Sequence, residues 1–112
     1  MKRVYVCGSF KFIDKIEDLE KLLKAAGVEF VVSKSLDPRG ILRCLEKIDQ
    51  ADVVYVVNPD GHVGKSVSVD IGYAYARNKP IYLMHATNDP PIMDLVKGIL
   101  TFERLVDFVK KR

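Results

Sequence analysis

"DVVYVVN", residues 52–58, is almost entirely apolar after its aspartate, and this run is the strongest fold signal in the chain. A strand that is half exposed alternates apolar and polar residues, whereas a central strand of a parallel sheet is covered on both faces and reads as a continuous apolar run. Residues 52–58 therefore predict the middle strand of a parallel sheet that carries helices on both sides.

Strand-like and helix-like segments alternate on either side of this run. We expect further strands at 3–9, 28–34 and 80–86, and a short fifth strand at 98–100. We expect helices over 13–27, from Asp37-Pro38 through Ile48, and over 101–111. The first helix has a capping box in Asp14 and Glu17, and the second has an apolar stripe of Ile41, Leu45 and Ile48.

Segment 65–78 fits two patterns. Alternate residues are apolar as in a strand, namely Val67, Val69, Ile71, Tyr73 and Tyr75. A helical stripe is also present, namely Val67, Ile71, Ala74 and Asn78. Because parallel neighbours need a crossover between them, usually a helix, we predict a helix here. The expected fold is a small doubly wound (flavodoxin/Rossmann-like) α/β parallel sheet of four to five strands with helices on both faces.

Composition limits the class of protein. The chain has 112 residues, 48% hydrophobic and 29% charged, which fits one globular domain over 1–112. A net charge of +3 with mixed signs does not predict a nucleic-acid polymer as partner. The apolar runs are strand-sized, so we expect no membrane span. Two lone cysteines without metal-ligand spacing, and no signal peptide before Cys7, favour a reduced cytoplasmic setting without a metal.

The fold itself locates a candidate site. In open α/β sheets, ligands bind beyond the carboxyl ends of the strands, near the point where the strand order reverses. The residues expected at that edge are Gly8, Ser9 and Phe10 after the first strand, Ser33 after the second, Asn58 after the third and His85 after the fourth.

"NPDGHVGKS", residues 58–66, ends like a phosphate-binding P-loop. That motif reads G-x-x-x-x-G-K-[ST], and the place of its first glycine is taken here by Pro59. Gly61 stands too close to Gly64 for the loop to enclose a triphosphate. A P-loop phosphotransferase is therefore disfavoured, and we interpret the segment as a turn that brings Ser66 to a sugar or a phosphate.

Ser66 and Asp70 are four residues apart and would share one face of the predicted helix. Near the helix start, a carboxylate can accept hydrogen bonds from a sugar or attack an electrophilic carbon. Asp70 can equally be a residue that only interacts favourably with the helix dipole. Spacing alone leaves both interpretations open.

The chain resembles the nucleoside 2-deoxyribosyltransferase family, including the 2′-deoxynucleoside 5′-monophosphate N-glycosidases, in "VYVCGSF", "ADVVYVVNPDGHVGKS" and "VDIGYAYARNKPIY". The resemblance implies a covalent double displacement at C1′ of a 2-deoxyribose. It implies that Asp70 is the nucleophile and that Tyr5 orients it. It further implies a homodimer or higher homo-oligomer, a small nucleoside or nucleotide as ligand, and no cofactor. The predicted substrate-binding residues are Gly8, Ser9, Phe10, Asn58, Gly61, Gly64, Ser66, Ser68 and His85.

The chain departs from this family at two positions. Asp70 stands where the family usually has Glu, so the carboxylate is drawn back by roughly 1.5 Å, about one C–C bond. Cys44 stands where the family commonly has an aspartate. A non-catalytic nucleotide-binding module on the same fold is therefore the alternative, because binding tolerates such changes better than chemistry does.

Overall fold

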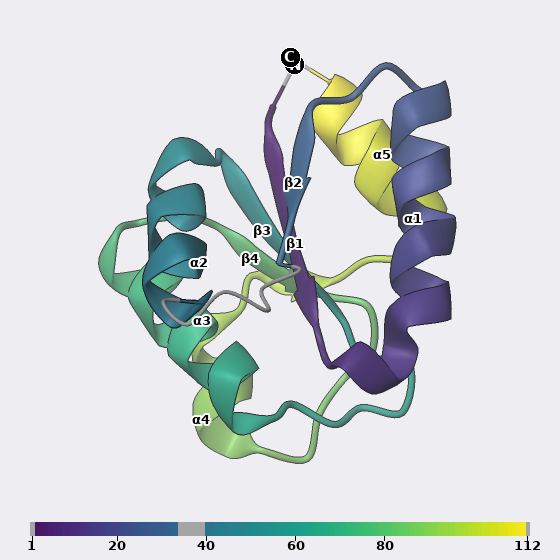
Figure 1. The fold of residues 1–112 in the computed structure, drawn as a ribbon. Coiled ribbons are helices and arrows are strands. Elements are labelled where there is room, and N and C mark those ends of the chain that lie inside the picture. The colour runs from purple at the N-terminus through teal and green to yellow at the C-terminus, as the bar shows by residue number, and fades with distance from the viewer. Residues whose placement is uncertain (1, 34–39, 112) are drawn as a thin grey trace.

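The computed structural model describes residues 2–33 and 40–111, in which helices cover both faces of a parallel five-stranded sheet (Figure 1). The strand order is β2-β1-β3-β4-β5. The strands are β1 (Val4–Gly8), β2 (Phe30–Val32), β3 (Val53–Val57), β4 (Ile81–Leu83) and β5 (Gly98–Ile99). The doubly wound α/β fold is confirmed, and so is the short fifth strand.

The central position of β3 is confirmed, because all five of its residues are buried. β3 pairs with β1 along its whole length, from Val4 opposite Val53 to Gly8 opposite Val57. The chain runs from β1 outward to β2 and then returns to place β3 on the other side of β1. The topological switch point therefore lies between β1 and β3, and a ligand site is expected at their carboxyl ends.

Two helical layers complete the fold (Figure 1). On one face of the sheet lie α2 (Gly40–Gln50), α3 (Lys65–Ala76) and α4 (Pro90–Leu95), and on the other lie α1 (Ile13–Ala25) and α5 (Phe102–Lys110). The ambiguous segment is helical, as predicted. Val67, Ile71 and Ala74 form its buried stripe, because a crossover between the parallel strands β3 and β4 must cover the sheet.

Two local expectations were wrong, and a third is not tested. Asp14 and Glu17 form no capping box, because α1 continues from a short 3₁₀ turn, Phe10–Phe12, and its N-cap position is Phe12. Ser9 caps that turn instead, accepting a hydrogen bond from the Lys11 N–H at 3.4 Å. Ile41 is exposed rather than packed in the core. The predicted helix start at Asp37-Pro38 lies outside the described residues.

Candidate active site

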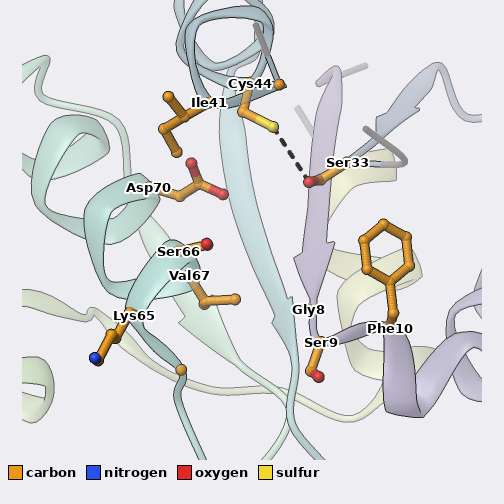
Figure 2. Close-up of a pocket in the computed structure, with 12 residues that line it drawn as sticks. Gly8, Ser9, Phe10, Ser33, Ile41, Cys44, Lys65, Ser66, Val67 and Asp70 are labelled. Atoms are coloured by element: carbon orange, nitrogen blue, oxygen red, sulfur yellow. Dashed lines mark hydrogen bonds between the residues drawn. The ribbon is translucent and has the colours of Figure 1, made fainter. Parts of the chain in front are cut away.

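A cavity of about 480 Å³ opens at the carboxyl ends of β1 and β2, where the switch point predicts a site (Figure 2). Its walls come from four parts of the fold, of which the end of β2 contributes Ser33. Gly8, Ser9 and Phe10 follow β1, Cys44 projects from α2, and Gly64, Ser66 and Asp70 belong to the start of α3. The structure therefore brings six of the predicted site residues together with a residue of α2 that the prediction had not included as a ligand contact.

Asp70 is the one carboxylate among the described residues of this cavity wall. Its side chain is only 3% exposed, and it points from α3 into the space between α2 and β1 (Figure 2). The Tyr5 hydroxyl donates a hydrogen bond to Asp70 Oδ2 at 3.1 Å. Asp70 Oδ1 is buried and has no hydrogen-bond partner among the described residues. One oxygen is thus held and the other is unpartnered.

Burial raises the pKa of Asp70 to about 6, and the hydrogen bond from Tyr5 opposes part of that rise. A carboxyl group with this pKa is mostly ionised at neutral pH but is far more basic than an exposed aspartate. The pKa of Tyr5 is raised as well, first by burial and then by the nearby Cys7 and Asp70. Tyr5 therefore keeps its proton and remains a hydrogen-bond donor to the carboxylate.

The first turn of α3 borders the cavity. Gly64 is the N-cap residue and has an extended backbone, and no side chain caps the helix there. Ser66 lines the cavity one turn before Asp70. Ser68 does not, because its hydroxyl donates a hydrogen bond to the Gly64 carbonyl at 2.8 Å. The start of α3 thus presents helix N–H groups and the Ser66 hydroxyl toward a ligand.

Three further predicted substrate-binding residues, besides Ser68, lie outside the cavity. The buried Asn58 amide donates to the His85 carbonyl at 2.8 Å and accepts from the His85 N–H at 3.0 Å. This pair ties the end of β3 to the end of β4. Gly61 has φ +79°, and a Cβ there would lie 2.7 Å from the Ala86 carbonyl oxygen, so it packs the two loops together. The structure places Asn58, His85 and Gly61 in this loop contact.

Ser33 and Cys44 line the cavity, although neither was among the predicted ligand contacts. Ser33 follows β2 at the same sheet edge as the other site residues, and that position was the available signal. Cys44 is buried on α2, and a lone cysteine of this kind is expected either in the core or in the lining of a site. Ser33 Oγ and Cys44 Sγ are 3.3 Å apart (Figure 2).

Residues 2–33 and 40–111 contain no group of three or more His, Cys, Asp or Glu side chains placed to hold a metal ion. Within the same ranges, no helix is both long enough and apolar enough to cross a membrane.

These observations define a small flavodoxin-like α/β domain whose cavity, at the switch point of the sheet, contains a tyrosine-held carboxylate. The fold is shared with a 2-deoxyribosyltransferase from Bacillus psychrosaccharolyticus, with a TM-score of 0.75 and 17% identity over 98% of this chain and 92% of that chain. A conserved protein from Enterococcus faecalis V583 matches with a TM-score of 0.76 and 15% identity over 98% of each chain.

A CMP N-glycosidase from Clostridium botulinum also has this fold, with a TM-score of 0.61 and 18% identity over 96% of this chain and 98% of that one. No protein-family model and no curated protein matches the sequence. At these identities the comparisons establish the fold. The expected likeness to a 2-deoxyribosyltransferase and to a nucleotide N-glycosidase is thereby confirmed for the fold. A shared fold does not by itself imply a shared activity.

Proposed function

We propose that the protein cleaves the N-glycosidic bond of 2-deoxyribonucleosides or their 5′-monophosphates through a covalent deoxyribosyl ester on Asp70. The observation that carries this proposal is the asymmetry of the Asp70 carboxylate. Tyr5 holds Oδ2, while Oδ1 is buried and unpartnered in a residue that lines the cavity. A buried polar atom without a partner is costly, and such atoms are concentrated where a ligand completes the site.

The proposed reaction has two displacements at C1′. In the first, Asp70 Oδ1 forms a bond to C1′, the C1′–N bond breaks, and the base leaves with the electron pair and takes up a proton from solvent. In the second, water or another base attacks C1′ and loses a proton, and the bond to Asp70 breaks to restore the carboxylate. Two inversions retain the configuration at C1′.

The other cavity residues fit the remainder of such a substrate. The Ser9 and Ser66 hydroxyls stand on opposite sides of the cavity, after β1 and at the start of α3 (Figure 2). The N-terminus of α3 favours negative charge, so a 5′-phosphate or a 5′-hydroxyl fits beside Ser66. Two proteins of the same fold are named as a 2-deoxyribosyltransferase and as a CMP N-glycosidase, which supports this class of substrate.

The direct test is chromatographic detection of free base from a panel of 2′-deoxynucleosides and their 5′-monophosphates, with and without an acceptor base. Asp70→Asn is expected to reduce base release by a factor on the order of 10³ or more, because an amide cannot form the ester. Asp94→Asn, which changes an exposed carboxylate of α4, is the matched control and should retain activity. Absence of base release from every substrate with the unaltered protein would refute the proposal.

A nucleotide-binding module without turnover is the second candidate, and the depth of Asp70 favours it. Asp70 is only 3% exposed. An aspartate side chain is also shorter than that of glutamate, so its carboxylate reaches less far into the cavity. Equilibrium binding of the same nucleosides and nucleotides separates the candidates. Binding that survives Asp70→Asn, with no base release by the unaltered protein, is the result expected of a binding module.

We also propose that the chain forms a homodimer through the outer surface of α3. Val69 and Tyr75 are both exposed on α3, and large apolar side chains left exposed on a helix favour an interface. Sedimentation velocity should show a dimer for the unaltered chain and a monomer for Val69→Glu. A monomer at every concentration of the unaltered chain would contradict this assembly.

A further inference from the structure

Two polar side chains of the cavity wall have no role in the chemistry proposed above. Ser33 follows β2 and is half-buried, and Cys44 lies on α2 with 5% of its surface exposed. Ser33 Oγ and Cys44 Sγ are 3.3 Å apart and share a hydrogen bond. In Figure 2, Ser33 and Asp70 lie on opposite sides of the cavity, and Cys44 lies above the space between them.

Both members of this pair are held by regular structure. The Ser33 N–H donates to the Val6 carbonyl at 2.9 Å, which extends the pairing of β2 with β1 by one residue. Lys47 of α2 donates to the Val32 carbonyl at 3.3 Å and so ties the end of β2 to that helix. Cys44 belongs to the buried cluster between α2 and the sheet. A side chain fixed in this way binds a ligand group with little further loss of conformational entropy.

The pair can donate to a ligand or accept from it. A serine hydroxyl and a thiol carry one hydrogen each, and their mutual hydrogen bond uses one of the two. If Cys44 is the donor, the Ser33 hydroxyl keeps its hydrogen for a ligand. If Ser33 is the donor, its oxygen still has a lone pair that can accept from one. A ligand hydroxyl group both donates and accepts, so it fits both arrangements, whereas a carbonyl or an ammonium group fits only one.

The proposed substrate has one sugar hydroxyl group that still needs a partner. The ester to Asp70 places C1′ at Oδ1, and the 5′ end of the sugar fits beside Ser66. The ring of a 2-deoxyribose then has a free hydroxyl group only on C3′, which is two bonds from C1′. The Ser9 hydroxyl already accepts a hydrogen bond from the Lys11 N–H. Among the described residues of the cavity wall, Ser33 has the remaining side-chain hydroxyl.

We propose that Ser33, held by Cys44, binds the 3′-hydroxyl group of the 2-deoxyribose and thereby selects substrates in which that group is free. This inference rests on the proposed function, because the ester to Asp70 determines where the sugar lies. The contact itself is a matter of binding, so it is measurable without turnover.

The experiment compares three nucleoside 5′-monophosphates of the same base, which carry 2′-deoxyribose, 2′,3′-dideoxyribose or ribose. Calorimetry gives their dissociation constants for the Asp70→Asn variant, which is not expected to consume them. The 2′,3′-dideoxy ligand should bind on the order of fivefold more weakly than the 2′-deoxy ligand, which is the effect of one neutral hydrogen bond. The 2′-hydroxyl group of the ribose ligand should not strengthen binding.

Three further substitutions are then made one at a time in the same Asp70→Asn protein. Ser33→Ala should weaken binding of the 2′-deoxy ligand to the level of the 2′,3′-dideoxy ligand. Binding of the latter should not change, which also shows that the cavity is intact. Cys44→Ser keeps a partner for Ser33 and should preserve the difference between the two ligands. Ser66→Ala is the matched control, because it removes a hydroxyl from the 5′ side of the same cavity and should weaken both ligands equally.

A difference between the two ligands that is lost in Ser33→Ala and kept in Ser66→Ala supports the assignment. Absence of binding, equal binding of both ligands before Ser33 is changed, or a difference that survives Ser33→Ala overturns it. Tighter binding of the ribose ligand that depends on Ser33 also overturns it, since the contact would then be to the 2′-hydroxyl group.

The base-release assay on the unaltered protein separates this inference from the proposed function. A Ser33-dependent difference in binding without any base release would retain the 3′-hydroxyl contact and refute the proposed function. Base release by a protein whose binding shows no dependence on Ser33 would retain the function and refute the contact. The two failures are therefore distinguishable.

Discussion

Tyr5 and Tyr55 are two fully buried tyrosines on neighbouring strands of the same sheet, and they have different partners. In the register of β1 and β3, Tyr5 lies opposite Val54 and Tyr55 lies opposite Val6, so their side chains point to opposite faces. Tyr55 donates to the Leu100 carbonyl at 2.7 Å on the face covered by α1 and α5. Tyr5 donates to the Asp70 carboxylate on the face covered by α2 and α3.

The difference shows how a structural tyrosine is distinguished from a site tyrosine. Tyr55 satisfies a neutral backbone carbonyl, and its ring packs edge-on against Phe102 with 6.1 Å between centroids. Tyr5 faces an ionisable group that still has an unpartnered oxygen. Burial is the same for both, so burial alone does not distinguish them. The incomplete hydrogen bonding of the partner marks the side of the sheet on which a ligand is expected.

The largest effect expected from this comparison is on turnover. Tyr5→Phe should lower base release by a factor on the order of 10², because the carboxylate loses the donor that orients it. Tyr55→Phe should leave kcat within about twofold, since its hydroxyl serves only the backbone. Initial rates on the best substrate of the panel measure both. Equal losses in the two variants would mean that Tyr5 acts only on folding.

The next effect is on the pH dependence of the rate. The pKa of Asp70 is raised from its ordinary value to about 6, and a nucleophile must be ionised. kcat/KM should therefore be constant above roughly pH 7 and fall about tenfold per pH unit below about 6. Tyr55→Phe should have the same acid limb. A limb that begins only below pH 5 would show that Asp70 is not the ionising group.

The smallest effect is on stability. Here the variants Asp70→Asn and Tyr55→Phe should change the free energy of unfolding in opposite directions. Folded Asp70 binds its proton more tightly than the unfolded chain, so its ionisation lowers stability as pH rises from about 4 to about 6. Asp70→Asn removes this cost and should raise the free energy of unfolding at pH 7.5 by about 1 kcal/mol, with no gain near pH 4. Urea titrations at the two pH values measure it.

Tyr55→Phe is the comparison variant in those titrations. It leaves the Leu100 carbonyl without its donor and should lower the free energy of unfolding by about 1 kcal/mol at both pH values. A loss of stability in Asp70→Asn that is as large at pH 7.5 as in Tyr55→Phe would mean that the Asp70 carboxylate has a structural role and carries no functional strain.

Sequence patterns predicted the parts of the fold that depend on hydrophobic periodicity. The apolar run of β3 and the crossover requirement were enough to place the sheet and to predict a helix in 65–78, which the structure has at Lys65–Ala76. They were not enough to fix local starts and ends. Asp14 and Glu17 have the right spacing for a capping box, but the turn that Ser9 begins shifts the position at which α1 starts.

Only part of the site was predicted, because sequence patterns place residues at a sheet edge but do not specify their local contacts. Tyr5 and Asp70 are 65 residues apart, and only the resemblance together with the fold rule paired them. Asn58 and His85 stand at the correct sheet edge, but a sequence does not reveal whether an amide there faces a ligand or the backbone of the next strand. Their mutual hydrogen bonds settle that choice. The place of Cys44 in the cavity wall depends on the rotation of α2, which an apolar stripe does not specify.

The unpartnered oxygen of Asp70 has a consequence for the lifetime of the proposed ester. The resting protein has to keep a negative charge on a buried side chain, and the covalent intermediate removes that charge and satisfies that oxygen. A sugar analogue that forms the ester but leaves slowly should therefore produce a protein that melts at a higher temperature than the free form. This destabilisation of the ionised ground state would favour formation of the ester. Breakdown of the ester restores the buried charge, so it would be the slower step of the cycle.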